Sequence, residues 1–572
     1  MKKKIFLILI SIILLTACQT QTSDKQSTVD KESAVSLVSK QDSNNPEFKY
    51  YHFNAEEAGY RSDRSNVLTP TFYIYAGPKT VDEANALVAE FEMSDVVEEW
   101  ASNVYVIPPI NGSTYSNDDM VAFIDLISQA PVANIKLIGI DEGATFVNNK
   151  LAPKYGYLIA GILTINGKVD EGVSLREQVP TYIVNSDEAV NLLYGQDDKK
   201  VSDTYQDQSN PLQKVVVSNL ENELAKIFED AWSKILSQNY RMHNDITEFY
   251  NANAKEITSG YGLEPVIDFE KLGIIYNQNE EVPLNGEGSY TWYEYVPKTI
   301  KDASKGTIPL IITLHGFAND PCLQGDTSGW VEVAAKEDIV IVSPEWQEKE
   351  LNFAKVDGLG EEGVLELIDY LKETYPQIDT SRIYLTGLSA GGSKTALWAA
   401  KHSDVFAAGA SVSAPGIDKE ELTQLARDYN GNKIPYLYVV GDHDFFQMVP
   451  VDGSSPFGMP NVFFDDPNVS MFEFIQAYQR MNDLPVSSKP DLNLNPYFGV
   501  ALSNQVEGIL GDKEILSGSM VDVDNENQEL IRLVTIKNLA HWNYRPEAAY
   551  IWNFFKQYER DSETGQLLFT QP

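Results

Sequence analysis

The sequence predicts an α/β fold, arranged as two consecutive domains behind a targeting segment. The chain has 572 residues, which allows about two to four domains, and 43% of them are apolar, enough to build buried cores. From about residue 263 onward, apolar strand-like runs alternate with helix-like segments, as expected of a parallel sheet with helices on both faces. Residues 48–262 repeat that order of segments, which indicates a second α/β domain.

The composition excludes several classes of function. Asp and Glu number 83 against 44 Lys and Arg, so the formal net charge is −39. A field of that sign repels phosphate backbones, and we therefore expect no nucleic-acid partner. The two cysteines are too few for a disulfide framework or for a zinc site of four thiolates.

Residues 1–17 have the pattern of a signal peptide. Three lysines precede an apolar run, Ile5 to Leu15, that is too short to span a bilayer. The ending Leu-Thr-Ala-Cys resembles the lipobox of bacterial lipoproteins, which implies cleavage before Cys18 and attachment of lipid to its sulfur. We therefore expect a lipid anchor on the extracytoplasmic face of the cell membrane, with residues 18–47 as a flexible polar linker. The alternative is an ordinary secretory signal with a chance cysteine.

The predicted catalytic domain, residues 263–572, begins with apolar strand-like runs. They lie at 308–317, 338–346, 382–392, 406–416 and 435–444. Most are apolar along their whole length, as strands buried on both faces of a sheet are. A helix is predicted over 361–375, where apolar residues recur at helical spacing: Val364, Leu367, Ile368 and Leu371.

A nucleophile motif follows the third of these runs. Residues 387–391 read Gly-Leu-Ser-Ala-Gly, between a strand and a helix predicted over 394–401. A tight strand-to-helix turn needs small residues two positions either side of the serine, and it exposes the hydroxyl above the sheet. The pattern therefore predicts Ser389 as a nucleophile; a plain glycine-rich turn is the alternative.

A serine nucleophile needs a base, and the base needs an acid to orient it. In a sheet of this kind, these groups follow the serine in the order acid, then histidine. The chain has six histidines, and the only one after the strand-end acids Asp442 and Asp444 is His541. His541 is thus the predicted base, and either acid can orient it. His443, between the two acids, is interpreted as a neighbour in the same turn, because three adjacent residues cannot all face one metal ion.

The stretches PLIITLHGF, SGWVEVAAKEDIVIVSPEW and RIYLTGLSAGGSKTALWAAKHSDVFAAGASVSA closely resemble the poly(3-hydroxybutyrate) depolymerase-type esterases. That group includes feruloyl and acetyl-xylan esterases. The resemblance covers roughly residues 290–445 and, more loosely, His541. It implies an α/β-hydrolase fold and a serine carboxylesterase with Ser389, Asp444 and His541 as the triad.

The same resemblance places the oxyanion hole at the backbone N–H groups of Phe317 and Ala390. His315, in the same loop as Phe317, is predicted to brace that loop. No cofactor or metal is expected, and the substrate is an ester of polyester, feruloyl or acetyl-carbohydrate type. The segment between Asp444 and His541 is longer than the family pattern, so part of 445–530 is expected to form a cap or wall over the pocket.

The first domain looks like a degenerate α/β-hydrolase copy. In the register of the second domain, Asp141 replaces the nucleophile, Ala189 the acid and Asn222 the base. None of these residues can perform the original role, since an asparagine takes up no proton. The alternative is an unrelated α/β domain whose segments match because such folds share a periodicity.

Two other functions fit parts of this pattern. A prolyl-oligopeptidase-like serine peptidase shares the fold and the triad order, although such enzymes usually carry a β-propeller ahead of the hydrolase domain. A lipid-anchored binding protein, with both domains catalytically inert, is the non-enzymatic alternative.

Overall fold

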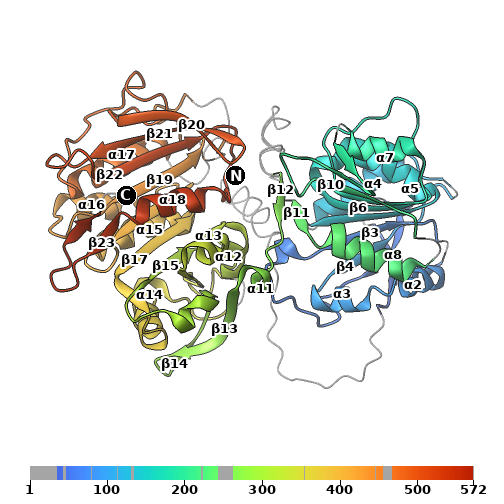
Figure 1. Ribbon diagram of the computed structural model, residues 1–572, viewed down its shortest axis with the longest axis horizontal. Helices are drawn as coiled ribbons and strands as arrows, with labels where there is room; N and C mark the ends of the chain where they lie inside the picture. Colours follow the sequence, from blue (N-terminus) through green and yellow to red (C-terminus); the bar gives the residue numbers. More distant parts are fainter. Residues whose placement is uncertain are drawn as a thin grey trace. The chain divides into compact units, whose positions relative to one another are not determined.

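The computed structural model describes residues 35–241 and 262–570, except for short stretches at 43–44, 46, 79, 113, 130–133, 197, 221–222, 353–354, 445, 447 and 455–466. The described residues form two compact units (Figure 1). The N-terminal unit contains residues 35–241 and 262–267, and the C-terminal unit contains residues 268–570. The predicted signal peptide and Cys18 lie outside the described residues. No helix within the described residues is long and apolar enough to cross a membrane.

The C-terminal unit is built on one large sheet. Ten of its described strands form this sheet in the order β13-β14-β16-β15-β17-β18-β19-β22-β21-β20. Their bounds are β13 Ile274–Leu284, β14 Glu287–Pro297, β15 Ile308–Leu314, β16 Val340–Pro344, β17 Ile378–Leu388, β18 Ala408–Val412, β19 Tyr436–Gly441, β20 Ser503–Leu510, β21 Lys513–Val521 and β22 Glu529–Ile536.

The middle of this sheet is parallel and its two edges are antiparallel. Strands β16, β15, β17, β18, β19 and β22 pair in parallel, while β13–β14 and β20–β21 flank them as hairpins. Every residue of β15, β16, β18 and β19 is buried, so both faces of the central sheet are covered. This explains why the strands read as unbroken apolar runs in the sequence.

Helices connect the parallel strands, as the alternating sequence pattern predicts. Their bounds are α11 Phe269–Leu272, α12 Pro321–Thr327, α13 Trp330–Glu337, α14 Gly360–Thr374, α15 Ala390–Lys401, α16 Lys419–Arg427, α17 Pro467–Met481 and α18 Glu547–Phe555, with a 3-10 helix at Lys298–Asp302. Helix α15 packs on β17 and β18, and α13 packs on α18. A separate two-stranded sheet pairs β23 (Tyr558–Arg560) with β24 (Leu567–Phe569).

The segment expected to form a cap has two described parts. Helix α17 packs against α16, and strands β20 and β21 continue the main sheet beyond β22. The polar sequence at 522–528 is the turn between β21 and β22, as a charged hairpin requires. These elements of the insertion therefore enlarge the sheet and its helical cover.

The N-terminal unit has a sheet of the same design. Its described strands lie in the order β1-β2-β4-β3-β5-β6-β7-β10-β9-β8, which matches the C-terminal sheet position by position. Their bounds are β1 Val38–Gln41, β2 Lys49–Phe53, β3 Thr71–Tyr75, β4 Asn103–Val106, β5 Ile135–Ile140, β6 Ile159–Ile165, β7 Thr181–Val184, β8 Lys199–Val201, β9 Thr204–Gln206 and β10 Lys214–Ser218. In both sheets the central strands are parallel and both edges are antiparallel.

Helices cover the N-terminal sheet as well. The α-helices are α2 Val81–Glu90, α3 Ser94–Glu99, α4 Asn117–Gln129, α5 Glu142–Phe146, α6 Ala152–Tyr155, α7 Glu188–Gly195 and α8 Leu224–Ala231, with 3-10 helices at Asn66–Leu68 and Gly156–Leu158 and π-helical turns at Val147–Leu151 and Trp232–Leu236. Alternate residues of β3 enter different cores: Tyr73 and Tyr75 pack in one cluster, and Phe72 and Ile74 in another. The sheet therefore has an apolar core on each face.

The structure moves both predicted boundaries of the first domain. Residues 38–41 were expected in the linker, but they form β1 and pair with β2, because the preceding Val35 and Leu37 are buried in the core. At the other end, β12 (Leu263–Pro265) pairs with β11 (Asn239–Arg241), so the unit extends to Ile267 instead of residue 262.

Candidate active site

Ser389 occupies a strained turn between β17 and α15. Its backbone angles are φ 54° and ψ −116°, a region that non-glycine residues rarely enter, at a typical cost of about 1–3 kcal/mol. The turn is fixed by the Ser389 N–H, which donates to Val412 O at 2.8 Å. A Cβ on Gly391 would lie 2.4 Å from His315 O, so only glycine fits two positions after the serine. The strand, turn and helix occur in the order that the motif predicts.

Asp444 and His541 meet at the same edge of the sheet. Asp444 follows β19, is 2% exposed, and its Oδ2 lies 2.7 Å from His541 Nδ1. Its other oxygen, Oδ1, accepts the Phe446 N–H at 2.9 Å. His541 follows β22, and the Phe446 ring packs edge-on against the imidazole, with centroids 4.9 Å apart. The Asp444 carboxylate is thus held in place by two hydrogen bonds, one of them with His541.

Asp442 has different partners. Its Oδ1 lies 2.6 Å from His443 Nδ1 and accepts the Asn538 N–H at 2.7 Å, and Tyr497 OH lies 3.3 Å from its Oδ2. These contacts join the ends of β19 and β22. Of the two acids that follow β19, the one against His541 is Asp444, which the family resemblance implies. Among the described residues, no group of three His, Cys, Asp or Glu side chains is placed to hold a metal ion.

The loop after β15 passes beside the nucleophile. A Cβ built on Gly316 would lie 3.5 Å from the Cβ of Ser389. Within the described residues, the N–H groups of Phe317 and Ala390 make no hydrogen bond, whereas the Ala318 N–H donates to Gln347 Oε1 at 2.8 Å. Neither the Phe317 N–H nor the Ala390 N–H is therefore committed to another group within the described residues.

His315 is fully buried at the start of this loop. Its Nδ1 lies 2.8 Å from Gly316 O and its Nε2 lies 3.1 Å from Glu345 Oε1. Burial lowers the pKa of His315, but the Glu345 carboxylate and the two hydrogen bonds outweigh it, so the net pKa is raised. With an acceptor at each nitrogen, the ring braces the loop and is not a free base.

The sequence analysis did not identify three contacts of this site. Phe446 packs on His541, and Glu345 and Gln347 hold the 315–318 loop. The only sequence signal for the last two is their position at the end of the strand-like run 338–346, at the edge where site residues gather.

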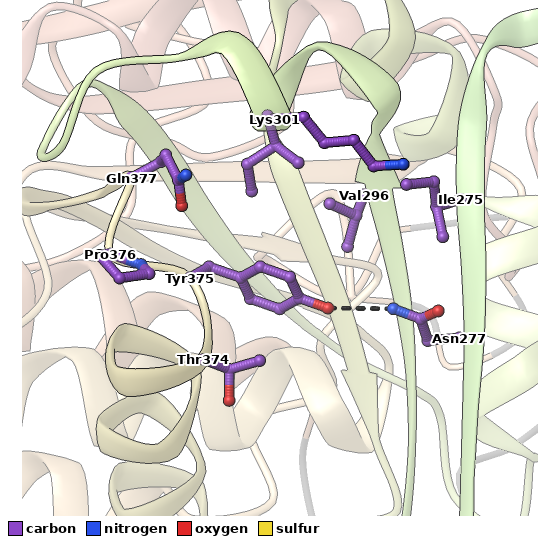
Figure 2. A pocket seen from close by; sticks show the side chains of 9 residues that line it. Ile275, Asn277, Val296, Lys301, Thr374, Tyr375, Pro376 and Gln377 are labelled. Atoms are coloured by element: carbon purple, nitrogen blue, oxygen red, sulfur yellow. Dashed lines mark hydrogen bonds between the residues drawn. The ribbon is translucent and has the colours of Figure 1, made fainter.

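A pocket of 270 Å³ lies elsewhere in the C-terminal unit, between β13, β14 and the end of α14 (Figure 2). Tyr375 projects across it, and the tyrosine OH accepts a 3.0 Å hydrogen bond from Asn277 Nδ2 and donates to Glu294 Oε2 at 2.6 Å. None of the candidate catalytic residues lines this pocket. The Tyr375 and Asn277 side chains of this pocket are thus hydrogen-bonded to each other.

The N-terminal unit contains the same strained turn. Asp141 follows β5 with φ 50° and ψ −112°, and its N–H donates to Ile165 O at 2.9 Å. A Cβ on Gly143 would lie 1.7 Å from Tyr75 O, so a glycine is again required two positions later. The exposed Asp141 carboxylate accepts a hydrogen bond from Asn166 Nδ2 at 2.9 Å.

The other predicted replacements differ in their placement. Ala189 lies in the first turn of α7, and Asn222 lies outside the described residues. His52, the histidine described in this unit, stacks on Tyr105 with centroids 4.1 Å apart, and burial lowers its pKa to about 4.

Comparison with known proteins finds similarity to hydrolases over part of the chain. A family model described as the prolyl oligopeptidase family matches residues 361–425, which include Ser389. A bifunctional acetylxylan esterase/xylanase of Neocallimastix patriciarum is 29% identical over 150 residues, covering 26% of this chain and 21% of that protein. Poly(3-hydroxyalkanoate) depolymerase C of Paucimonas lemoignei is 28% identical over 179 residues, covering 26% of this chain and 42% of the relative.

The chain therefore spans less than half the length of these curated relatives. Among solved structures, an acetyl xylan esterase from Aspergillus awamori aligns with 49% of this chain and 99% of its own, at 12% identity and a TM-score of 0.32.

Proposed function

We propose that the C-terminal unit is a serine carboxylesterase with Ser389, His541 and Asp444 as its catalytic triad. The observation that carries the proposal is the 2.7 Å contact between His541 Nδ1 and buried Asp444, in a unit whose strained turn presents Ser389. The three residues follow β17, β19 and β22, which are parallel. Since carboxyl ends of parallel strands share one edge of a sheet, this topology supports a common site for the three residues.

The mechanism uses the same groups in both half-reactions. Ser389 Oγ attacks the ester carbonyl while His541 Nε2 accepts its proton, and Asp444 holds the Nδ1–H and stabilises the imidazolium. The oxyanion is bound by the N–H groups of Phe317 and Ala390. His541 then protonates the leaving alcohol, and a water molecule releases the acyl group by the same steps. No cofactor or metal takes part in this scheme.

Labelling with a fluorophosphonate probe tests the nucleophile directly. The native protein is expected to react, and Ser389→Ala is expected to remain unlabelled with an unchanged circular dichroism spectrum. If well-folded native protein is not labelled, the esterase proposal fails and a non-catalytic binding role is favoured.

The proposed substrates are esters of acetyl, feruloyl or polyester type. The names of the two curated relatives, an acetylxylan esterase and a poly(3-hydroxyalkanoate) depolymerase, support this range. A panel of acetylated xylan, methyl ferulate and a 3-hydroxybutyrate oligomer, compared by kcat/KM, ranks the classes. Turnover of p-nitrophenyl acetate without turnover of any of the three would place the natural substrate outside this range.

A serine peptidase is the second candidate, because the prolyl oligopeptidase family model matches 361–425. Against it, the described residues ahead of this unit form an α/β sheet and not a β-propeller. Comparing an aminoacyl p-nitroanilide with p-nitrophenyl acetate separates the two functions, since a peptidase would cleave the anilide at a comparable kcat/KM.

We further propose that the N-terminal unit is a duplicated hydrolase domain that has lost its triad. The identical order of ten strands and the shared strained turn, with Asp141 in place of Ser389, support a common origin. A Ser389→Ala protein should then have no residual esterase activity. Activity that survives this substitution and disappears with Asp141→Ala would contradict the loss of function.

The lipid anchor at Cys18 is also a proposal, supported by the Leu-Thr-Ala-Cys sequence at 15–18. Expression in a bacterial host with an alkyne-labelled fatty acid should label the native protein and not Cys18→Ser. Equal labelling of both proteins would exclude this site of attachment.

A further inference from the structure

Three consecutive side chains after β16 form hydrogen bonds with the loop that contains Phe317. Glu345 Oε1 lies 3.1 Å from His315 Nε2, Trp346 Nε1 donates to His315 O at 3.0 Å, and Gln347 Oε1 accepts the Ala318 N–H at 2.8 Å. We call Glu345, Trp346 and Gln347 the β16 clamp.

The clamp is itself firmly held. Its residues are 1%, 8% and 2% exposed, in chain order. The Gln347 N–H donates to Glu345 Oε1 at 2.8 Å, and Asn352 Nδ2 donates to Gln347 O at 2.9 Å. Hydrogen bonds shielded from water in this way resist exchange with solvent, so the clamp is a rigid reference for the loop.

The hydrogen bonds of the β16 clamp lie on both sides of the peptide group that joins Gly316 to Phe317. They hold the His315 carbonyl before Phe317 and the Ala318 N–H after it. The Ala318 N–H already donates to Gln347, and it is therefore not available to bind an oxyanion. The Phe317 N–H between them makes no hydrogen bond within the described residues, and the loop passes beside Ser389.

We propose that the β16 clamp positions the Phe317 N–H for the oxyanion, with Gln347 as its main positioning residue. This inference rests on the esterase function proposed above. The clamp touches no substrate atom; it acts by keeping a backbone donor where negative charge develops. An oxyanion donor stabilises the transition state more than the bound ester, so a displaced donor lowers kcat and leaves KM nearly unchanged.

Gln347→Met tests this proposal, because methionine has a similar length and replaces the amide oxygen by a thioether, which is only a weak acceptor for the Ala318 N–H. Removal of an oxyanion donor costs about 10²–10³ in kcat, and a donor that is only displaced should cost less, about tenfold to a hundredfold. We expect that loss with p-nitrophenyl acetate, with KM within twofold. Inhibition by phenylboronic acid, whose serine adduct is tetrahedral, should weaken by a similar factor.

Gln479→Met is the matched control in the same unit. Gln479 on α17 is also 2% exposed, and its Oε1 also accepts a backbone N–H, that of Ser487 at 2.9 Å. Its substitution removes this bond, and also the two bonds that its Nε2 donates to Ser487 Oγ and Met520 Sδ, all away from the 315–318 loop. We expect kcat within threefold of the native value, even if the melting temperature falls as much as in Gln347→Met.

A second pair of variants covers the case in which Gln347→Met does not fold. Trp346→Phe replaces the indole by the smaller phenyl ring and removes the donor to His315 O. Trp398→Phe makes the same exchange in the indole that packs edge-on against Trp346, and so controls for the lost ring. We expect kcat to fall threefold to tenfold in Trp346→Phe alone.

The outcomes separate this inference from the proposed function. If the native protein is not labelled by fluorophosphonate, the esterase proposal itself fails. If it is labelled and active, the positioning role can be tested with Gln347→Met and Trp346→Phe. That role would be overturned if these variants kept the native kcat, if only their KM rose, or if each lost no more activity than its control variant.

Discussion

Exchange of Asp444 for asparagine is the sharpest test of the triad. In the native protein the two carboxylate oxygens of Asp444 have separate partners, His541 Nδ1 at 2.7 Å and the Phe446 N–H at 2.9 Å. In Asp444→Asn the amide oxygen keeps the bond to Phe446, and the amide NH₂ faces His541. The imidazole must then accept at Nδ1 and carry its proton on Nε2, where it cannot take the proton of Ser389.

The size of the effect follows from this tautomer change. The equivalent exchange in a serine hydrolase triad lowers kcat by about 10⁴, which corresponds to roughly 5.5 kcal/mol of transition-state stabilisation. Because the asparagine is isosteric and the site is buried, the fold should be kept and KM should change little. Steady-state hydrolysis of p-nitrophenyl acetate, with circular dichroism as the check on folding, measures both.

Asp442→Asn is the matched control, two residues earlier in the same turn. Asp442 bonds to His443 and to the Asn538 N–H, so its exchange removes a charge near the site without changing the partner of His541. We expect kcat within about threefold of the native value. The assignment of the acid would be refuted if Asp442→Asn lost more activity than Asp444→Asn, or if Asp444→Asn kept a tenth of the native kcat.

Two further predictions concern stability. Gly391→Ala should lower the free energy of unfolding by about 2 kcal/mol or more and abolish activity, because the new Cβ would lie 2.4 Å from His315 O. Gly508→Ala is the control, since the atom nearest to its Cβ would be 3.7 Å away, and it should leave the free energy of unfolding nearly unchanged. Urea titrations measure both. Burial raises the pKa of Glu547 to about 8, so the stability it confers is complete below about pH 4.5 and is lost as the pH rises through 8. Glu547→Gln should therefore raise the melting temperature relative to native protein at pH 9 and not at pH 5; the same difference at both pH values would contradict this.

The strands and the position of the nucleophile could be predicted from the sequence because both depend on local patterns. A run buried on both faces is apolar throughout, as β15 and β19 are, and the spacing of glycines around Ser389 is required by the close approach of α15 to β15. His541 could be selected without coordinates because it is the only histidine after the strand-end acids, and the strand order places the residues after β19 and β22 at the same edge.

The choice between Asp442 and Asp444 could not be made in this way. Both follow the same strand, and which one faces His541 depends on how the backbone turns over two residues. The β16 clamp was missed for a related reason. Its bonds join residues about 30 positions apart, as from Glu345 to His315, and such contacts leave no periodic pattern in the sequence.

Comparison of the strained turns at Asp141 and Ser389 distinguishes the residues that the fold requires from those that the proposed chemistry requires. Asp141 and Ser389 have nearly the same backbone angles, and each is followed two positions later by a glycine that packs against the neighbouring strand end. The turn geometry therefore does not depend on the side chain at its apex. In the proposed mechanism, catalysis depends instead on groups brought from other strands. In the C-terminal unit these are the Asp444–His541 pair and the N–H of Phe317, which makes no hydrogen bond within the described residues. A G-x-x-x-G pattern after a buried strand thus predicts the turn, and only the later acid and histidine distinguish a nucleophile from a structural residue.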